Sequence, residues 1–423
     1  MPPSPSCRTL GTIIKRHKLN MRQMTIFEDF ENENEEDLVQ SLEKFDQAVI
    51  WGTDWTAETI TNQLYRKNID LFPKFQRRDA WSQIAKSKFI ESLILGLPIP
   101  QIILAEKKED KGKYIVIDGK QRLLTIRQFF SKAENDEFTP LKLKGLEILK
   151  DLNRKKFTDI ENNPEFNKIL NQLLNQTIRT TVIKNWPNEE FLFTVFLRLN
   201  TGSIKLSPQE LRQALHPGKF IDFADNFSIE SSGIKKILNI SEPDYRMRDV
   251  ELVIRFFTFK MFILTYDGNL KKAFDNAVKT LNENWEINED LVNENALNLE
   301  SAINLTLEIF GEKEAFSKWS NNKFQSNFNR AIYDIMVYYF SDLNILESSK
   351  TKKEEILDAF KKLCQEDNNF ITSFEHTTKS MGNMSKRFET WGEKLSEILN
   401  IEIEIPYLVE NHFELKKYKH GNV

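Results

Sequence analysis

The chain has 423 residues, which is enough for two or three domains with a substantial buried core. It carries 59 Lys and Arg against 63 Asp and Glu, so its net charge of −4 excludes a globally basic nucleic-acid binder but leaves room for a local basic groove. The two cysteines, Cys7 and Cys364, exclude a disulfide framework and a thiolate metal cluster, and they favour a reducing, cytoplasmic setting. No uninterrupted apolar run approaches the roughly 18 residues of a membrane span, so no membrane partner is expected.

The first 37 residues have the composition of a flexible arm. Five Lys and Arg, with no acid, fall in residues 1–24, and eight Asp and Glu follow in residues 28–43. Blocks of like charge repel one another and stay solvated. We therefore expect residues 1–37 to form a mobile arm, with Met21 and Met24 as alternative starts of translation.

Residues 38–220 alternate between helical and strand-like patterns. Trp51 and Trp55 flank a Gly-Thr-Asp sequence that is typical of a turn. Three apolar runs predict strands, and the charged KKEDKG between the first two predicts a hairpin; the runs are QIILAE, KYIVID and TIRTTVI. Ser207 and Glu210 predict a capping box at the start of a helix. Apolar spacing predicts four earlier helices, over residues 58–67, 81–95, 121–131 and 188–200.

Past residue 220 the pattern changes to that of amphipathic helices. Apolar residues recur at helical spacing in six segments, at residues 249–265, 269–284, 292–310, 324–342, 352–365 and 383–399. No strand is predicted there until IEIEIPYLV, and the terminal ELKKYKH is predicted to be a solvated tail. The chain is thus predicted to be an α+β protein, with a mixed α/β region over 38–220 and a larger helical region over 221–423.

Residues 116–126, VIDGKQRLLTI, place an Asp-Gly turn between a strand and a helix. The first N–H groups of a helix lack backbone acceptors and carry partial positive charge, so such a turn binds phosphates readily. Arg122 adds a bidentate donor and Lys120 a mobile point charge, while Asp118 could hold Mg²⁺ or orient an attacking water. Gly119 permits a close backbone approach or a positive φ. The turn is a candidate phosphate site, although Asp118 capping the helix and pairing with Arg122 would explain the same residues.

Two other stretches place cations near turns. FPKFQRRDAW puts Gln76, Arg77 and Arg78 after an extended, proline-containing segment, which by itself is typical of a solvated loop. FLRLNTGSIKLSPQELRQAL puts Arg198 and Asn200 before the capped helix, where Arg198 by itself would be a surface charge. Neither stretch identifies a site by itself.

The stretches together resemble one family. The order FQR…W, ESLILGLPIPQIIL, IVIDGKQRLLTI and FLRLNTGSIKLSPQELRQAL is similar to the GmrSD-type DGQQR domain over about residues 55–230. YRMRDVELVIRFF, residues 245–257, resembles the helical continuation of that family. The resemblance implies a ParB/sulfiredoxin-like core followed by an all-helical domain. It also implies nucleotide binding, with hydrolysis in some members, and a role in bacterial defence against phage or modified foreign DNA.

Carried over residue by residue, the resemblance implies one nucleotide-binding and catalytic set. Asp118 would hold Mg²⁺ and act in catalysis together with Arg122 and Arg77. The sequence departs from the family pattern at Lys120, where the family has Gln. The residues that would contact the nucleoside triphosphate, whether GTP, ATP or CTP, are Gln76, Arg77, Gly119, Lys120, Gln121, Arg122, Arg198 and Asn200.

The five histidines give no sign of an HNH nuclease. Such a domain needs a histidine general base with further metal ligands, and none of the five stands in an HNH, HxxP or DH pattern. His216, ahead of Pro217, is predicted to lie at a helix C-terminus. His376 is the one histidine that stays a candidate functional residue, and a core or surface role explains it as well. We expect no HNH domain in this chain and, without a GxxxxGK[ST] sequence, no P-loop.

Three functions remain open at this point. In the first, which we favour, the chain is an NTP-hydrolysing sensor or switch, with DNA as a signal and a separate effector nuclease as partner. In the second, the ParB-like core is itself a metal-dependent DNA nuclease, whose substrate phosphate would occupy the place of the nucleotide. In the third, the core is a non-catalytic module that binds DNA or a protein, and the helical region forms a homo-oligomer.

Overall fold

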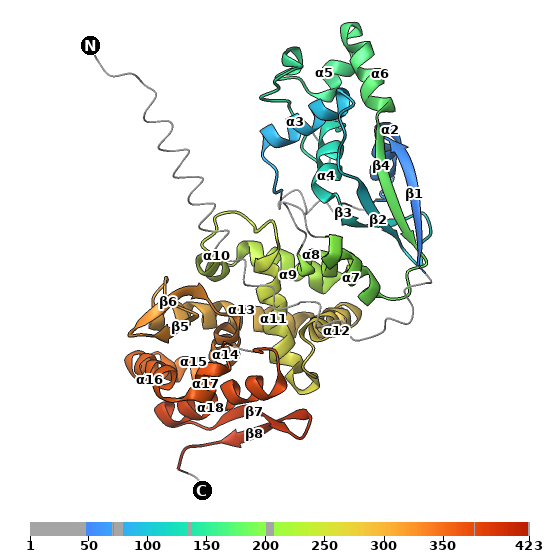
Figure 1. Cartoon of the computed structure of the whole chain (residues 1–423). Helices are drawn as coiled ribbons and strands as arrows, with labels where there is room; N and C mark the ends of the chain where they lie inside the picture. Colours follow the sequence, from blue (N-terminus) through green and yellow to red (C-terminus); the bar gives the residue numbers. More distant parts are fainter. Residues whose placement is uncertain are drawn as a thin grey trace, which may run out of the picture. The chain divides into compact units, whose positions relative to one another are not determined.

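The computed structural model describes residues 48–69, 71, 79–132, 138–199, 207–375 and 377–421. The predicted arm lies outside these described residues, and so do Gln76, Arg77 and Asn200. The described chain divides into two units (Figure 1). The sheet unit holds the residues up to Pro217 together with Glu242–Arg248, and the helical unit holds Gly218–Ser241 and the residues from Asp249 onwards. The predicted domain bounds, residues 1–37, 38–220 and 221–423, stay a prediction.

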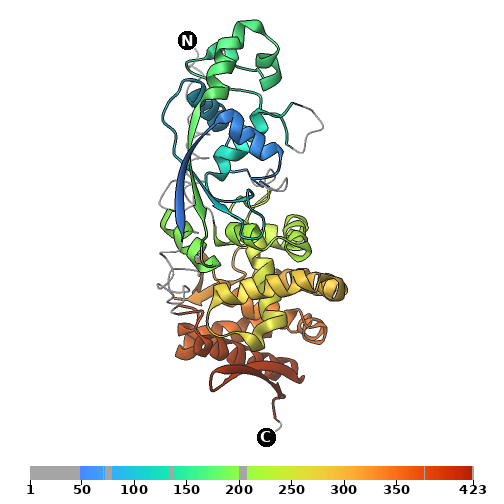
Figure 2. The same cartoon turned by 90° about the vertical axis from the view of Figure 1, so that its right-hand side faces the viewer.

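The sheet unit is built on a four-stranded mixed sheet in the order β1-β4-β2-β3 (Figures 1 and 2). β2 and β3 form an antiparallel hairpin, β2 runs parallel to β4, and β4 pairs antiparallel with β1. This confirms the three predicted strands and the predicted hairpin. The strands are β1 (Val49–Thr56), β2 (Ile102–Glu106), β3 (Tyr114–Asp118) and β4 (Thr177–Lys184).

The turn predicted between Trp51 and Trp55 is wrong. The segment is the first strand, and all of its residues pair with β4, from Val49 opposite Lys184 to Thr56 opposite Thr177. Gly52 is not among the glycines with a positive φ, so it serves here as an extended residue. The local turn preference of Gly-Thr-Asp is overridden by pairing with a strand that lies more than a hundred residues away in the sequence.

Both faces of the sheet are buried, which explains the uninterrupted apolar run in β2. Ile102 and Leu104 point into one hydrophobic cluster, with residues of the first three helices, and Ile103 and Ala105 point into a second cluster. α7 (Glu189–Leu199) supplies four side chains to the second cluster: Phe191, Leu192, Phe193 and Phe196. The other α-helices of the unit are α2 (Ala57–Tyr65), α3 (Gln83–Ile94), α4 (Lys120–Phe129), α5 (Phe157–Glu161), α6 (Asn167–Asn175) and α8 (Pro208–Leu215).

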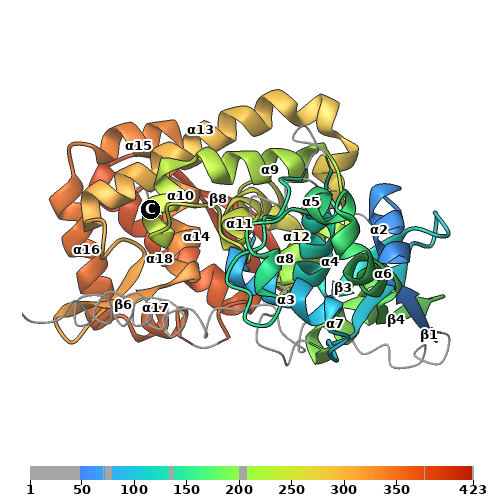
Figure 3. The ribbon, with the colours of Figure 1, turned by 90° about the horizontal axis from the view of Figure 1, so that it is seen from above.

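The helical unit confirms the predicted change of pattern past residue 220. Its longest described helix, α13 (Trp285–Phe310), has 26 residues and is seen lengthwise in Figure 3. The core of the helical unit is apolar but also encloses an Arg255–Asp334 ion pair. The remaining α-helices are α9 (Lys219–Glu230), α10 (Ser232–Leu238), α11 (Arg248–Phe262), α12 (Leu270–Glu283), α14 (Arg330–Phe340), α15 (Leu343–Ser349), α16 (Lys353–Glu366), α17 (Asn368–Thr372) and α18 (Met381–Leu399).

Two hairpins make this unit mostly helical rather than all-helical. β5 (Ser317–Ser320) and β6 (Lys323–Phe328) pair where a helix was expected to begin at residue 324. Their turn residues Asn321 and Asn322 both have positive φ, which favours a tight hairpin over a helix. β7 (Ile403–Val409) confirms the predicted C-terminal strand. The predicted solvated tail is wrong for residues 414–418, because they belong to its partner β8 (His412–Tyr418).

The class assigned from the sequence, α+β, is confirmed: a mixed four-stranded sheet with helices precedes a mostly helical region. No helix in the part of the chain that the structure describes combines the length and apolarity of a membrane span.

Candidate functional site

The DGKQR turn starts where β3 ends, at Asp118. Gly119 has φ +100°, in the left-handed region that side chains disfavour. A Cβ at this position would lie 3.2 Å from Ile102 Cγ1 and 3.3 Å from Arg122 Nη2. The turn therefore requires glycine both for its backbone conformation and for the close packing around it.

The helix that follows begins without a side-chain cap. Gly119 is the N-cap residue of α4, and the first helical bond runs from Leu123 N to Gly119 O at 3.0 Å. The backbone N–H groups of Gln121 and Arg122, which precede that bond, therefore have no acceptor in the helix. Asp118 does not cap α4, so this part of the alternative explanation from the sequence is wrong. The helix presents N–H donors at its positive end, beside Asp118.

Arg122 and Asp118 form an ion pair across the turn. Arg122 Nη2 lies 2.8 Å from Asp118 Oδ2 and also donates to Gln101 O at 3.0 Å. The arginine side chain is 14% exposed and the aspartate 41%, so the carboxylate stays open to solvent and to a metal ion. Arg122 Nε and Gln121 Oε1 are buried and have no hydrogen-bond partner among the described residues. The pairing expected as an alternative explanation is thus present, yet it leaves polar atoms of the turn unsatisfied.

Lys120 is not the mobile point charge expected from the sequence. Its ammonium forms an ion pair with Glu210 on α8, and each side chain is 6% exposed. Glu210 is also the N3 residue of the predicted capping box, which is present: its carboxylate accepts from Ser207 N at 2.8 Å and its own N–H donates to Ser207 Oγ at 3.2 Å. The pair connects the first residue of α4 to the first turn of α8.

The chain just after the QR motif is anchored to α4. Asp79 accepts from Lys86 Nζ and from Trp81 N, the latter at 3.2 Å, and Lys86 also donates to Gln128 Oε1 at 2.7 Å. Burial lowers the pKa of the Lys86 ammonium to about 8, which leaves it mainly protonated at neutral pH beside the Asp79 carboxylate. Gln76 and Arg77 lie outside the described residues, so only this attachment point next to them is observed.

The structure does not bring Arg198 to the turn by any bond. Arg198 lies exposed in the last turn of α7, and within the described ranges no hydrogen bond or ion pair joins it to the DGKQR residues. Asn200 lies outside those ranges. His216 is the C-cap residue of α8, as predicted for a helix C-terminus, and its Nε2 lies 3.5 Å from Glu189 Oε2.

Sequence reasoning missed two of these relationships. The Lys120–Glu210 pair spans 90 residues, and spacing along the chain carries no signal for it. The Lys86 anchor has a weak signal, since Lys86 lies three residues before Phe89 and four before Ile90, on the apolar face of its helix. A charge on such a face indicates a buried partner.

Asp118 supplies the one carboxylate within the DGKQR turn. Among the residues that the structure describes, no group of three or more His, Cys, Asp or Glu side chains is arranged to hold a metal ion. A single carboxylate fits Mg²⁺ in a nucleotide site, because that ion keeps several waters and takes further oxygens from the substrate phosphates.

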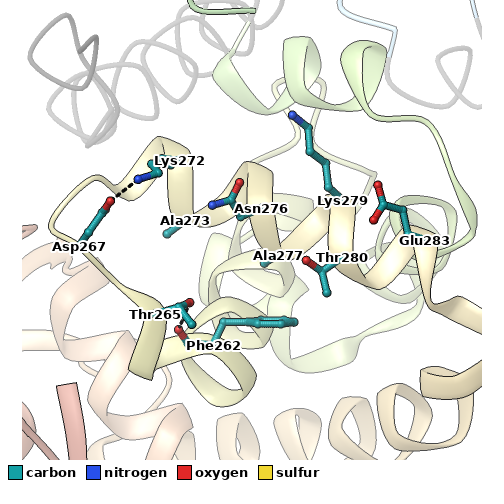
Figure 4. A pocket seen from close by; sticks show the side chains of 10 residues that line it. All are labelled: Phe262, Thr265, Asp267, Lys272, Ala273, Asn276, Ala277, Lys279, Thr280 and Glu283. Atoms are coloured by element: carbon teal, nitrogen blue, oxygen red, sulfur yellow. Dashed lines mark hydrogen bonds and ion pairs between the residues drawn. The ribbon is translucent and has the colours of Figure 1, made fainter. Parts of the chain in front are cut away.

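A pocket of about 560 Å³ lies in the helical unit (Figure 4). Lys272 points toward Asp267 there and pairs with it at 2.5 Å. None of the predicted site residues that the structure describes lines this pocket, so it is not counted as part of the candidate site. The lining residues are Phe262, Thr265, Asp267, Lys272, Ala273, Asn276, Ala277, Lys279, Thr280 and Glu283.

Comparison with protein families decides what the sheet unit is. Residues 59–217 match the family described as GmrSD restriction endonuclease, N-terminal domain. This part of the chain is a GmrSD N-terminal domain. The GmrSD domain is restriction-related and contains the DGKQR turn, α7 and α8. Comparison with curated proteins and with solved structures gives no match.

Proposed function

We propose that this GmrSD domain binds a nucleoside triphosphate and Mg²⁺ at the DGKQR turn and hydrolyses the nucleotide. The chain would then be a cytoplasmic sensor or switch in bacterial defence against phage or foreign DNA. The observation that carries the proposal is the N-terminus of α4 at Gly119, which has no side-chain cap and is flanked by the Asp118 carboxylate and the Arg122 guanidinium.

The turn has the donors that a phosphate needs. The backbone N–H groups of Gln121 and Arg122, at the positive end of α4, make no helical bond, and such groups bind phosphate oxygens. Gly119 has no side chain between them and a ligand. Arg122 Nε and Gln121 Oε1 are buried polar atoms that lack partners in the part of the chain that the structure describes, and a bound nucleotide with its water would satisfy them.

The charges of the turn support an exchange of partners on binding. In the structure Arg122 is matched by Asp118 and Lys120 by Glu210. Mg²⁺ held by Asp118 would supply positive charge that screens the phosphates. Arg122 would then exchange that carboxylate for a phosphate oxygen, where it would stabilise charge that develops during hydrolysis. Arg77 and Arg198 are proposed as further phosphate ligands.

Phosphate release tests this proposal. Purified protein with Mg²⁺ and ATP, GTP, CTP or UTP, with and without DNA, is expected to release phosphate from at least one nucleotide. Arg122→Ala should abolish that release, whereas Arg179→Ala, which removes an exposed arginine of β4, should leave it unchanged. No release from any nucleotide would contradict the NTPase proposal, and stimulation by DNA would identify DNA as the signal.

The family description supports a second candidate, a nuclease that acts on DNA directly. A DNA phosphate and a nucleotide phosphate require the same metal and the same arginine, so Asp118 and Arg122 would serve either substrate. DNA cleavage that needs Mg²⁺ and Asp118 but no nucleotide would favour this candidate. In the first candidate a separate effector nuclease would cut the DNA, and the chain itself would not.

A further inference from the structure

We propose that Lys120 is a positioning residue for the nucleotide site, acting through Glu210, and not a phosphate ligand. The inference rests on the proposed nucleotide binding at the DGKQR turn, and it identifies what holds that turn in place. Lys120 is the first residue of α4, directly after Gly119, where a lysine would ordinarily be expected to reach an incoming phosphate.

The direction of the side chain argues against phosphate contact. Lys120 Nζ is paired with Glu210 Oε1, and the two side chains are 6% exposed each. Asp118 in the same turn is 41% exposed, so the open side of the turn is at the aspartate and not at the lysine. Turning Lys120 toward a phosphate would leave the Glu210 carboxylate buried without its partner, which is costly.

Glu210 is itself held at fixed geometry. One carboxylate oxygen of Glu210 accepts from Lys120 Nζ, and the other accepts from Ser207 N at 2.8 Å. Ser207 Oγ in turn accepts from Glu210 N at 3.2 Å. The capping box therefore fixes Glu210 to the start of α8. Through the ion pair it also fixes the first residue of α4, the helix that carries Gln121 and Arg122.

The departure from the family pattern fits this role. A Gln at position 120, as in the DGQQR pattern, could donate a hydrogen bond from a neutral amide to the same carboxylate. Lysine makes the donor charged as well, so the bond becomes an ion pair between two full charges. Breaking a buried pair by removing one partner is strongly destabilising, whereas neutralising both partners is much less so.

A double-mutant cycle on nucleotide affinity separates positioning from direct contact. Lys120→Gln and Glu210→Gln are each expected to weaken binding of the Mg²⁺–nucleotide at least about 10-fold, because each removes one charge of the buried ion pair and leaves a net charge in its place. The double variant K120Q/E210Q should bind within about 3-fold of wild type, because its two amides can bond and the amide introduced at position 210 still caps α8. The measurement is titration calorimetry with the nucleotide that wild type binds best, beside melting curves of the free proteins.

Positioning by Lys120 and direct contact of Lys120 with the phosphate predict different outcomes. If the double variant is no better than Lys120→Gln while Glu210→Gln binds like wild type, Lys120 contacts the phosphate and the inference is wrong. If a single variant fails to fold, the affinity of the double variant decides: binding within about 3-fold of wild type supports positioning, and a loss of about 10-fold or more contradicts the inference. If wild type binds none of the four triphosphates with Mg²⁺, the proposed function is overturned and this inference with it.

A buried pair in the helical unit provides the matched control. Arg330 makes two bonds to Glu251, at 2.8 and 3.1 Å, with the arginine side chain 7% exposed. Arg330→Gln should lower the melting temperature and leave nucleotide affinity unchanged. Loss of affinity in this control equal to that of Lys120→Gln would mean that general destabilisation explains both results and would overturn the inference.

Discussion

Arg122 Nη2 lies 2.8 Å from Asp118 Oδ2, so the guanidinium on the first turn of α4 holds the carboxylate at the end of β3. The same nitrogen donates to Gln101 O at 3.0 Å. The two side chains that a phosphate site would use for metal and anion are thus paired with each other in the structure. Binding of metal and phosphate together would separate them, and this coupling gives the first prediction.

Replacing Asp118 by Asn should separate binding from turnover. The variant frees Arg122 from its carboxylate, so nucleotide binding without Mg²⁺ should tighten, while the benefit of added Mg²⁺ should disappear. Hydrolysis should fall by about 100-fold or more, because the metal that screens the phosphate charge is no longer held. Calorimetry with and without Mg²⁺, and phosphate release, measure the two effects. Unchanged Mg²⁺ dependence in the variant would exclude Asp118 as the metal ligand.

Replacing Gly119 by Ala should destabilise the sheet unit and weaken nucleotide binding. The left-handed φ costs about 1–2 kcal/mol for a residue with a Cβ, and the new methyl would press on Ile102 and Arg122. Gly112→Ala is the matched control, since Gly112 has φ +86° with nothing within 4 Å of its Cβ position. Urea unfolding should show the larger loss at Gly119, and only that variant should lose affinity. Equal effects would mean that close packing at the turn is unimportant.

The loss of stability of the folded protein at acidic pH should depend on Glu91. Burial by itself raises the pKa of this carboxyl, but backbone N–H donors from Leu149, Ile148 and Glu147 outweigh burial and lower the pKa below its ordinary value. The stabilisation is therefore complete above the ordinary value of 4.5 and is lost as the pH falls through the lowered pKa.

Glu91→Gln provides the measurement for that prediction. The variant should be less stable than wild type at neutral pH, and its free energy of unfolding should fall less between pH 5 and pH 3. Unfolding by urea at several pH values gives both quantities. A parallel decline in the two proteins would show that the hydrogen bonds to residues 147–149 are not linked to the acid transition.

Replacing Asp334 by Asn should be among the most damaging single changes in the helical unit. Asp334 is fully buried and pairs with Arg255, with Arg255 Nη2 2.7 Å from Oδ2, and Arg387 Nη2 lies 3.7 Å from the same oxygen. The variant leaves two buried guanidinium groups without this carboxylate, at a cost of about 3–5 kcal/mol. Glu147→Gln, at the exposed pair with Lys88, should cost far less, because solvent screens that pair. Comparable losses in urea unfolding would contradict this account.

The sequence predicted those elements whose signal is local. The apolar run of β3 and the turn residues at Asp118 and Gly119 define a strand, a turn and a helix within a short window, and all three are present. The capping box of Ser207 and Glu210 is equally local, because its two bonds join residues three apart.

The sequence did not predict what depends on distant partners. The segment VIWGTDWT becomes a strand because β4 offers it a full set of backbone partners, and Gly-Thr-Asp alone favours a turn. Likewise, nothing near Lys120 indicates that its charge is buried against Glu210. Side-chain chemistry at the turn was predicted by residue type, whereas the pairing of its charges required the fold.

Hydrogen exchange at the DGKQR turn tests the central claim most directly. The backbone N–H groups of Gln121 and Arg122 have no helical acceptor, so they should exchange rapidly in the nucleotide-free protein. With Mg²⁺ and the preferred nucleotide, a peptide covering residues 118–124 should become strongly protected, and Arg122→Ala should remove that protection. Bound nucleotide with unchanged exchange at 118–124, and protection elsewhere, for example along α12, would contradict the account.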